Sequence, residues 1–177
     1  VSDDGSVIVG ESSAGEQGTV AFRWEGGAMT GLGSLDEVEG SWSRAFGVSA
    51  DGAVVVGTSS STSLPGCTLA NGCEQAFRWQ DGVMTGLGAL GAGGGGQATP
   101  FSWGTATSAD GDVVVGFSTT TGGPIEEAFR WEDGLMQGLG MLPGGVNGSL
   151  AVDVSADGSV VVGMSDDWLT FERAENY

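Results

Sequence analysis

Carboxylates are the residues of this chain that are numerous enough to support acid–base chemistry. The 177 residues include 23 aspartates and glutamates, five cationic residues that are all arginine, and no histidine. Without histidine or lysine the chain cannot form a Ser-His-Asp triad, a Cys-His pair, a Schiff base or a histidine zinc site. Paired carboxylates could still hydrolyse a glycosidic bond, but no pair stands out by its spacing. We therefore predict a protein without catalytic activity, and keep a carboxylate-dependent, glycan-active enzyme as an alternative.

One short run of carboxylates is a candidate calcium site. Asp36, Glu37 and Glu39 lie close together in the sequence, and Ca²⁺ prefers clustered oxygen ligands. Their spacing matches neither an EF-hand loop nor the Gly-Gly-x-Gly-x-Asp repeat of calcium-binding β-helices. We therefore expect that no cofactor is required, with Ca²⁺ at these three residues as the alternative.

The two cysteines are close enough to bond to each other. Cys67 and Cys73 are separated by five residues that include Asn71-Gly72, a dipeptide that favours tight turns. A disulfide here would indicate an oxidising compartment. A metal site is the weaker alternative, because the chain has no further cysteine and no histidine to complete it. We predict a Cys67–Cys73 disulfide.

An internal repeat predicts the secondary structure that carries these residues. The block Val-Ser-Asp-Asp-Gly-Ser-Val-Ile-Val-Gly at residues 1–10 recurs, with changes, at 48–57, 107–116 and 154–163. A repeat of about 50 residues is typical of one supersecondary unit stacked on copies of itself. The architecture is therefore much better determined by the sequence than the ligand is.

A second repeated block combines an aromatic residue, an arginine and a tryptophan. Ala-Phe-Arg-Trp occurs three times, each time followed by Gly, Met and Leu-Gly. An arginine present in every repeat is expected to make a contact between repeats, such as an ion pair with a carboxylate or stacking on a ring. We therefore assign a structural role to the residues of this block: Phe22, Arg23, Trp24, Phe77, Arg78, Trp79, Phe129, Arg130 and Trp131.

Each repeat predicts four short strands. In the second repeat they are 45–49, 53–57, 75–79 and 83–88, and Asp-Gly follows both the first and the third, a hairpin signal because Asp and Gly tolerate positive φ. Four antiparallel strands in about fifty residues form one blade of a β-propeller. Since no window has a helical period of apolar residues, we predict an all-β fold: a β-propeller or propeller fragment of four-stranded antiparallel blades.

The chain holds about three and a half to four such blades in a single repeat domain, residues 1–177. The approximate units are 1–44, 45–102, 103–149 and a partial unit at 150–177. The first unit lacks a first strand, and residues 168–173 keep only part of the third-strand pattern. An open strand edge invites another strand, so we expect self-association or continuation in a longer chain, with closure of the two ends on each other as the alternative.

A candidate ligand site lies on the face that carries the variable connections. Short, uniform turns and connections of variable length lie on opposite faces of an up-and-down blade, and function tends to reside on variable loops held by a rigid scaffold. Trp42, Arg44, Phe101 and Trp103 lie at the starts of first strands on that face. Their rings could stack on sugars, with Arg44 and acids such as Glu37 as hydrogen-bonding groups; alternatively both indoles pack between neighbouring blades.

The repeat resembles two known families to different degrees. The order of its strands is similar to that of WD-repeat blades, but the Gly-His and Trp-Asp signatures are missing. Ala-Phe-Arg-Trp, Gly-x-Met-x-x-Leu-Gly and Val-Ser-Ala-Asp-Gly-Ser-Val-Val-Val-Gly resemble the bacterial HAF repeat over residues 1 to about 165. The histidine that names that motif is Val20, Gln75 and Glu127 here, so no role of an imidazole carries over. The resemblance implies an exported repeat protein.

Charge and compartment complete the prediction of function. The formal net charge of −18 repels phosphate backbones, which excludes nucleic acid as a partner. No apolar run is long enough to span a bilayer. We predict a non-catalytic, extracellular or cell-surface binding module for adhesion or for glycan or protein recognition, in a bacterium of Gram-negative type, with the periplasm as the alternative location. A structural array that assembles edge to edge with other copies is the alternative function.

Overall fold

The fold is all-β within the part of the chain that the structure describes. The computed structural model describes residues 1–13, 18–68, 72–91, 99–120, 126–143 and 148–165. These residues form thirteen strands and no helix, so none of them provides a helix that could cross a membrane. The strands make antiparallel sheets, two of which have four strands, and this confirms the predicted all-β fold and four-stranded unit.

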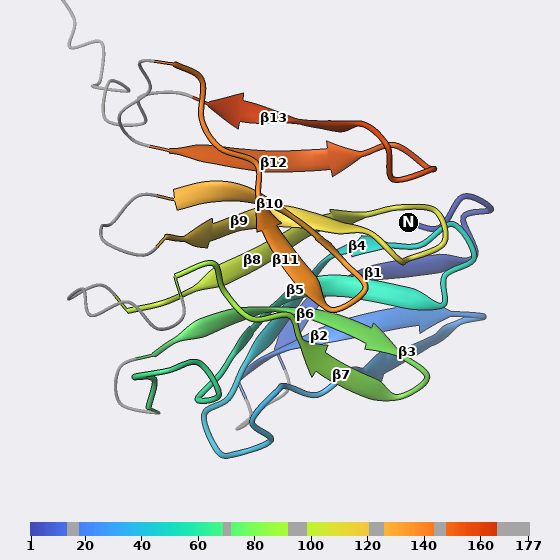
Figure 1. Ribbon diagram of the computed structural model, residues 1–177. Coiled ribbons are helices and arrows are strands. Elements are labelled where there is room, and N and C mark those ends of the chain that lie inside the picture. The colour runs from blue at the N-terminus through green and yellow to red at the C-terminus, as the bar shows by residue number, and fades with distance from the viewer. Residues whose placement is uncertain (14–17, 69–71, 92–98, 121–125, 144–147, 166–177) are drawn as a thin grey trace, which may run out of the picture.

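Strands that follow one another in the chain are neighbours in their sheet (Figure 1). The first sheet contains β1 (Val7–Ser13), β2 (Thr19–Glu25) and β3 (Ala28–Gly31). The second contains β4 (Ser43–Val48), β5 (Val54–Ser60), β6 (Glu74–Gln80) and β7 (Val83–Gly86). The third contains β8 (Ser102–Thr107), β9 (Val114–Thr119), β10 (Glu126–Glu132) and β11 (Leu135–Gly138). The fourth contains β12 (Ser149–Val154) and β13 (Val161–Ser165).

The strands of the second sheet lie where the repeat predicts them, with bounds shifted by at most three residues. The first strand begins earlier than expected because Ser43 already pairs with Ser59, and it contains a bulge between Ala45 and Gly47. The same bulge recurs in β8 and β12. The third-strand remnant expected at 168–173 lies outside the described residues.

The sheets stack in chain order, and each interface between neighbours holds its own apolar cluster (Figure 1). Between the second and third sheets, Val54 and Val56 pack against Val114 and Phe129. Val55, on the other face of the same strand, packs toward the first sheet. Strand β5 is therefore buried on both faces, which explains its unbroken run of valines.

A Ser-x-Asp-Gly turn precedes the second strand of each unit and satisfies its own polar groups. In the second sheet, the Ser49 hydroxyl donates to Asp51 Oδ1 (2.6 Å), which also accepts the Ala53 N–H (2.9 Å). The Val54 N–H donates to Ser49 Oγ, and Gly52 has a φ of +74°. Corresponding bonds form around the other three turn aspartates: Asp4, Asp110 and Asp157.

Successive turns are also bonded to one another across the sheet interfaces. The Asp3 N–H donates to the Ala50 carbonyl (3.1 Å), the Ala50 N–H to the Ala109 carbonyl (3.0 Å) and the Ala109 N–H to the Ala156 carbonyl (3.0 Å). We call this series the turn ladder. It joins all the sheets with one kind of bond, made by the same position of every repeat.

A valine of each sheet covers the turn glycine of the next sheet so closely that only glycine fits. A Cβ built on that glycine would lie 2.4 to 2.6 Å from a valine Cγ2. The pairs are Val7 with Gly52, Val54 with Gly111, and Val113 with Gly158. The turn glycine therefore permits the close approach of neighbouring sheets as well as the hairpin.

The repeated arginines reach across the same interfaces. Arg23 Nε donates to the Gly52 carbonyl (2.9 Å) and Arg78 Nε to the Gly111 carbonyl (2.8 Å), while Arg130 lies 3.4 Å from the Gly158 carbonyl. A carboxylate or amide two residues further along the same strand, Glu25, Gln80 or Glu132, also lies 2.7 Å from Nη1. The predicted ion pair between sheets is present at Arg78, whose Nη2 lies 3.8 Å from Asp112 Oδ1 of the third sheet, and the shorter hydrogen bonds between sheets are made to backbone carbonyls.

Candidate functional site

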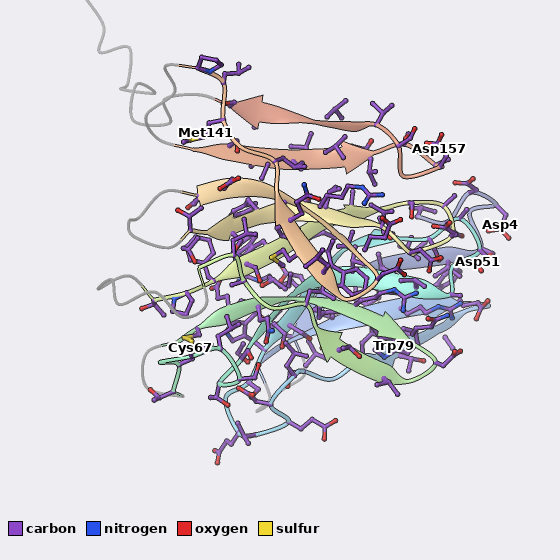
Figure 2. All side chains as sticks on the ribbon, in the orientation of Figure 1. Asp4, Asp51, Cys67, Trp79, Met141 and Asp157 are labelled. Atoms are coloured by element: carbon purple, nitrogen blue, oxygen red, sulfur yellow. A yellow bond between two sulfur atoms is a disulfide. The ribbon has the colours of Figure 1, made fainter. Side chains whose placement is uncertain are left out.

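The variable connections lie at the end of the sheets opposite the Ser-x-Asp-Gly turns. Figure 2 shows Asp4, Asp51 and Asp157 together at one end and Cys67 at the other. We call these the turn end and the loop end. The starts of β6, β8 and β10 and the last residues of β9 all lie at the loop end, because neighbouring strands are antiparallel.

Four aromatic rings gather at the loop end of the second and third sheets. Trp103 of β8 stacks on Phe46 of β4, with ring centroids 5.7 Å apart and planes 14° apart. On β9, Phe117 lies 5.6 Å from Trp103 and 6.2 Å from Phe101, which it meets edge to face. Centroid distances in this range are favourable for aromatic pairs. The four rings therefore form one connected cluster, which we call the aromatic cluster.

Two carboxylates border the aromatic cluster. Trp103 Nε1 donates a hydrogen bond to Glu74, the first residue of β6, which also forms a parallel bridge with Phe101. Glu126, the first residue of β10, forms a parallel bridge with Gly148, and burial raises the pKa of its carboxyl above the ordinary value. Backbone pairing therefore fixes the backbone positions of Glu74 and Glu126 at the border of the aromatic cluster.

Three of the four rings and both carboxylates line a cleft of about 360 Å³. Its walls combine aromatic rings, two carboxylates and small polar groups: Gly72, Cys73, Glu74, Thr99, Phe101, Trp103, Phe117 and Glu126. A concave site lined by rings with a few polar groups is the usual form of a small-ligand site. The cleft is of a size to hold one or two sugar rings, and its acceptors suit hydroxyl groups.

The structure separates the four predicted ligand residues into two groups. Phe101 and Trp103 line the cleft. Arg44 instead stacks over Trp42, with its guanidinium carbon 4.9 Å from the ring centroid, and its Nε lies 2.8 Å from Glu11 Oε2. Arg44 is therefore engaged with its own sheet and with β1, and the cleft is built by the second and third sheets.

The three predicted calcium ligands, Asp36, Glu37 and Glu39, lie in different surroundings. Asp36 Oδ1 accepts hydrogen bonds from the N–H and the hydroxyl of Thr62, both at 3.1 Å. Glu37 and Glu39 line a separate hollow beside the first sheet. Among the described residues no three His, Cys, Asp or Glu side chains are arranged to hold a metal ion. The three carboxylates therefore do not supply the clustered oxygens that Ca²⁺ requires.

The predicted disulfide is present and borders the cleft. Cys67 and Cys73 are bonded, with Cα atoms 5.7 Å apart. Cys73 is buried and precedes Glu74 directly. The disulfide therefore ties down the connection that leads into β6, beside one of the two carboxylates.

Four residues of the aromatic cluster and its border were not predicted from the sequence: Phe46, Phe117, Glu74 and Glu126. One signal was available for the two aromatic residues: each is a departure from the repeat. The position of Phe117, directly after the strand glycine, is Glu11, Thr58 or Met164 in other units, and Phe46 corresponds to Thr105 and Val152. For Glu74 and Glu126 there was no such signal among so many carboxylates.

The fold is similar to that of a larger protein of known structure. The crystal structure of TolB from Acinetobacter baumannii matches with a TM-score of 0.57 at 15% sequence identity. The match covers 92% of this chain and 35% of TolB, so this chain spans about a third of TolB's length. Because TolB contains a β-propeller, the likeness shows a β-propeller-like arrangement of sheets. No family model matches the sequence, and no curated protein matches it significantly.

Proposed function

We propose that the protein is a non-catalytic β-propeller module that binds a neutral glycan in the cleft at its loop end. The observation that carries this proposal is the cleft itself, in which the rings of Phe101, Trp103 and Phe117 lie beside the carboxylates of Glu74 and Glu126. Aromatic rings offer a sugar its apolar face, and carboxylates accept hydrogen bonds from hydroxyl groups.

The charge of the protein narrows the class of ligand. Among the described residues no cation lines the cleft, and the whole chain carries a net charge of −18. An anionic polysaccharide or a phosphate-bearing ligand would be repelled. A neutral glycan, presented by a polymer or by a glycosylated surface, meets both the shape and the charge of the site.

The compartment and the family are part of the same proposal. The Cys67–Cys73 bond is of a kind that persists in oxidising compartments. We propose an extracellular, cell-surface or periplasmic location, and membership of the HAF-repeat proteins on the repeat motifs. The likeness to TolB supports the β-propeller architecture on which this proposal rests.

Binding to a glycan array, followed by calorimetry with the best neutral glycan, tests the proposal. Phe101→Ala is expected to weaken binding at least tenfold, since stacking is lost while the β8–β9 pairing stays. The matched control is Trp42→Ala, which removes an aromatic residue outside the cleft and should leave affinity unchanged. Failure of every neutral glycan to bind, or equal loss with both variants, would reject the proposal.

One observation favours a second candidate, a glycan-active enzyme. Glu126 has a pKa raised by burial, as a general acid requires, and Glu74 lines the same cleft. Incubation with a panel of neutral polysaccharides, with reducing ends measured over time, distinguishes the two. Turnover that Glu126→Gln abolishes would establish the enzyme, whereas binding without turnover supports the binding module.

A further inference from the structure

The two ends of the stack of sheets expose residues that every inner interface buries. Val160 of the last sheet is 57% exposed, although its counterparts Val54 and Val113 are 1% and 4% exposed. Val162 is 51% exposed, whereas its counterpart Val56 is fully buried. Within the described residues, the outer face of β12–β13, at the top of the stack in Figure 1, is therefore an uncovered copy of the face that each inner sheet turns toward the next. We call it the trailing face.

The first sheet exposes the opposite kind of surface. Ile8 is 40% exposed, although its counterpart Val55 is fully buried. The face is hollowed by a cleft of about 800 Å³ that Phe22 and Met29 help to line. In the second sheet the residue corresponding to Phe22 is Phe77, which is buried against the preceding sheet. We call this outer face of β1–β3 the leading face.

The surroundings of the turn glycines also show that, among the described residues, no valine covers the leading face. A Cβ on Gly52, Gly111 or Gly158 would collide with a valine of the preceding sheet, but a Cβ on Gly5 would have nothing within 4 Å. The missing neighbour of Gly5 corresponds in the repeat to Val160, the most exposed valine of the trailing face. The trailing face therefore carries an exposed valine, and the leading face carries the glycine that such a valine covers at the inner interfaces.

The turn ladder ends in complementary groups at the two faces. Along it, each N–H donates to the carbonyl of the next sheet. Within the described residues the Asp3 carbonyl accepts no such bond, and the Ala156 N–H donates none. A donor is thus left at the trailing face and an acceptor at the leading face, in the same repeat position.

We propose that two copies of this chain associate head to tail, the trailing face of one on the leading face of the other. Val160 covers Gly5 of the partner copy, Val162 packs against Ile8 and Phe22, and the Ala156 N–H extends the turn ladder to Asp3. The occupant follows from continuity with the inner interfaces, which already join these same repeat positions. This inference is independent of the ligand proposed for the cleft.

The contact is heterologous, so it produces a ring or a filament according to whether the rotation closes. Two copies bring together eight sheets, which is within the four to eight blades of closed propellers. The high negative charge of each copy opposes the association, and salt screens that repulsion. We therefore expect the association to strengthen as the ionic strength rises.

Analytical ultracentrifugation of the whole chain, over a range of concentrations and at low and high salt, tests the proposal. The wild-type chain is expected to form dimers or larger assemblies. Val160→Asp and Ile8→Asp should each weaken association at least tenfold, while Val83→Asp, which charges an exposed residue of strand β7 in an inner sheet, should have no effect. Circular dichroism and thermal melting check that each variant is folded.

Mixing the two defective variants distinguishes head-to-tail contact from a symmetric one. Val160→Asp keeps an intact leading face and Ile8→Asp keeps an intact trailing face, so an equimolar mixture should form a heterodimer although neither variant dimerises alone. A wild-type chain that stays monomeric at high concentration and high salt would overturn the proposal. Failure of the two variants to associate with each other would also overturn it, because the contact would then not join two different faces.

Discussion

The two ends of the sheets differ in how strictly they follow the repeat. At the turn end every unit places the same serine, aspartate and glycine in the same bonds, and the turn ladder joins them. At the loop end the units differ, and there aromatic rings and two carboxylates share a cleft. The polar groups of the turn end hold sheets together, whereas at the loop end the carboxylates of Glu74 and Glu126 line the cleft.

This difference indicates which residues of a repeat protein are candidates for a functional site. A residue present in every unit is explained by a contact present at every interface, as the arginine bonds to glycine carbonyls show. A residue that breaks the repeat needs another explanation, and Phe46 and Phe117 both belong to the aromatic cluster. Departures from the repeat are therefore a better guide to the site than its most frequent residues.

The largest effect is expected from a substitution at the turn end of an inner interface. Gly111→Ala should lower the free energy of unfolding by about 3 kcal/mol, because it combines a positive φ of +79° with a Cβ placed 2.4 Å from Val54 Cγ2. Gly5→Ala is the matched control. It has the same kind of backbone, with φ +72°, and no atom in the way.

Urea unfolding of both variants, at a concentration where the chain is monomeric, measures the difference. Gly5→Ala should cost about 1 kcal/mol, the backbone share alone. Equal losses in the two variants would show that the valine-on-glycine contact does not set the spacing of the sheets, and the contrast between the two ends would lose its physical basis.

A smaller effect on stability is expected at the loop end. Replacing both cysteines, as Cys67→Ser with Cys73→Ser, should cost at most about 2–3 kcal/mol, because so short a loop constrains little of the unfolded chain. The same change should weaken ligand binding in the cleft, since Cys73 precedes Glu74. Thermal melting and calorimetry on one sample measure both; a large loss of stability with unchanged binding would contradict the assignment of the disulfide to the site.

The smallest expected effects are those of pH on the stability of the fold. Carboxylates at the turn end and at the loop end should change this stability in opposite directions. At the turn end, hydrogen bonds from Ser6 hold the pKa of Asp4 at about 2 and those from Ser155 hold the pKa of Asp157 at about 2, below the ordinary 3.8. The bonded carboxylates therefore stabilise the fold above about pH 4, and this contribution is lost as the pH falls toward 2. At the loop end the raised pKa of Glu126 makes its ionisation unfavourable, so its contribution declines as the pH rises above 4.5.

Urea unfolding between pH 2 and 7 separates the two responses. Asp51→Asn, at a turn whose aspartate pKa is lowered chiefly by the Ser49 hydroxyl, should reduce the loss of stability in acid. Glu126→Gln should reduce the decline on the other side of pH 4.5. If both variants changed the same limb of the curve, the two ends would not differ electrostatically.

The strands and the hairpins could be predicted from the sequence because their signals are local. Asp-Gly after a strand specifies a turn wherever it occurs, and Val54 to Val56 indicate burial on both faces. The cleft could not be predicted, since Phe46 and Trp103 are brought together only by the stacking of two sheets. The same holds for Arg78, whose partner is a carbonyl 33 residues away. What the sequence determines is the unit; contacts between units depend on the angle at which they stack.

The turn ladder has a consequence for how such a protein can change its length. Each rung joins the same repeat position of neighbouring sheets, so a unit added by duplication of its coding segment meets partners that already fit it. Stability in such an array is close to a sum over adjacent units. Lengthening or shortening the protein by whole units therefore requires no new chemistry at the junctions, and the loop end of each added unit is free to acquire a specificity of its own.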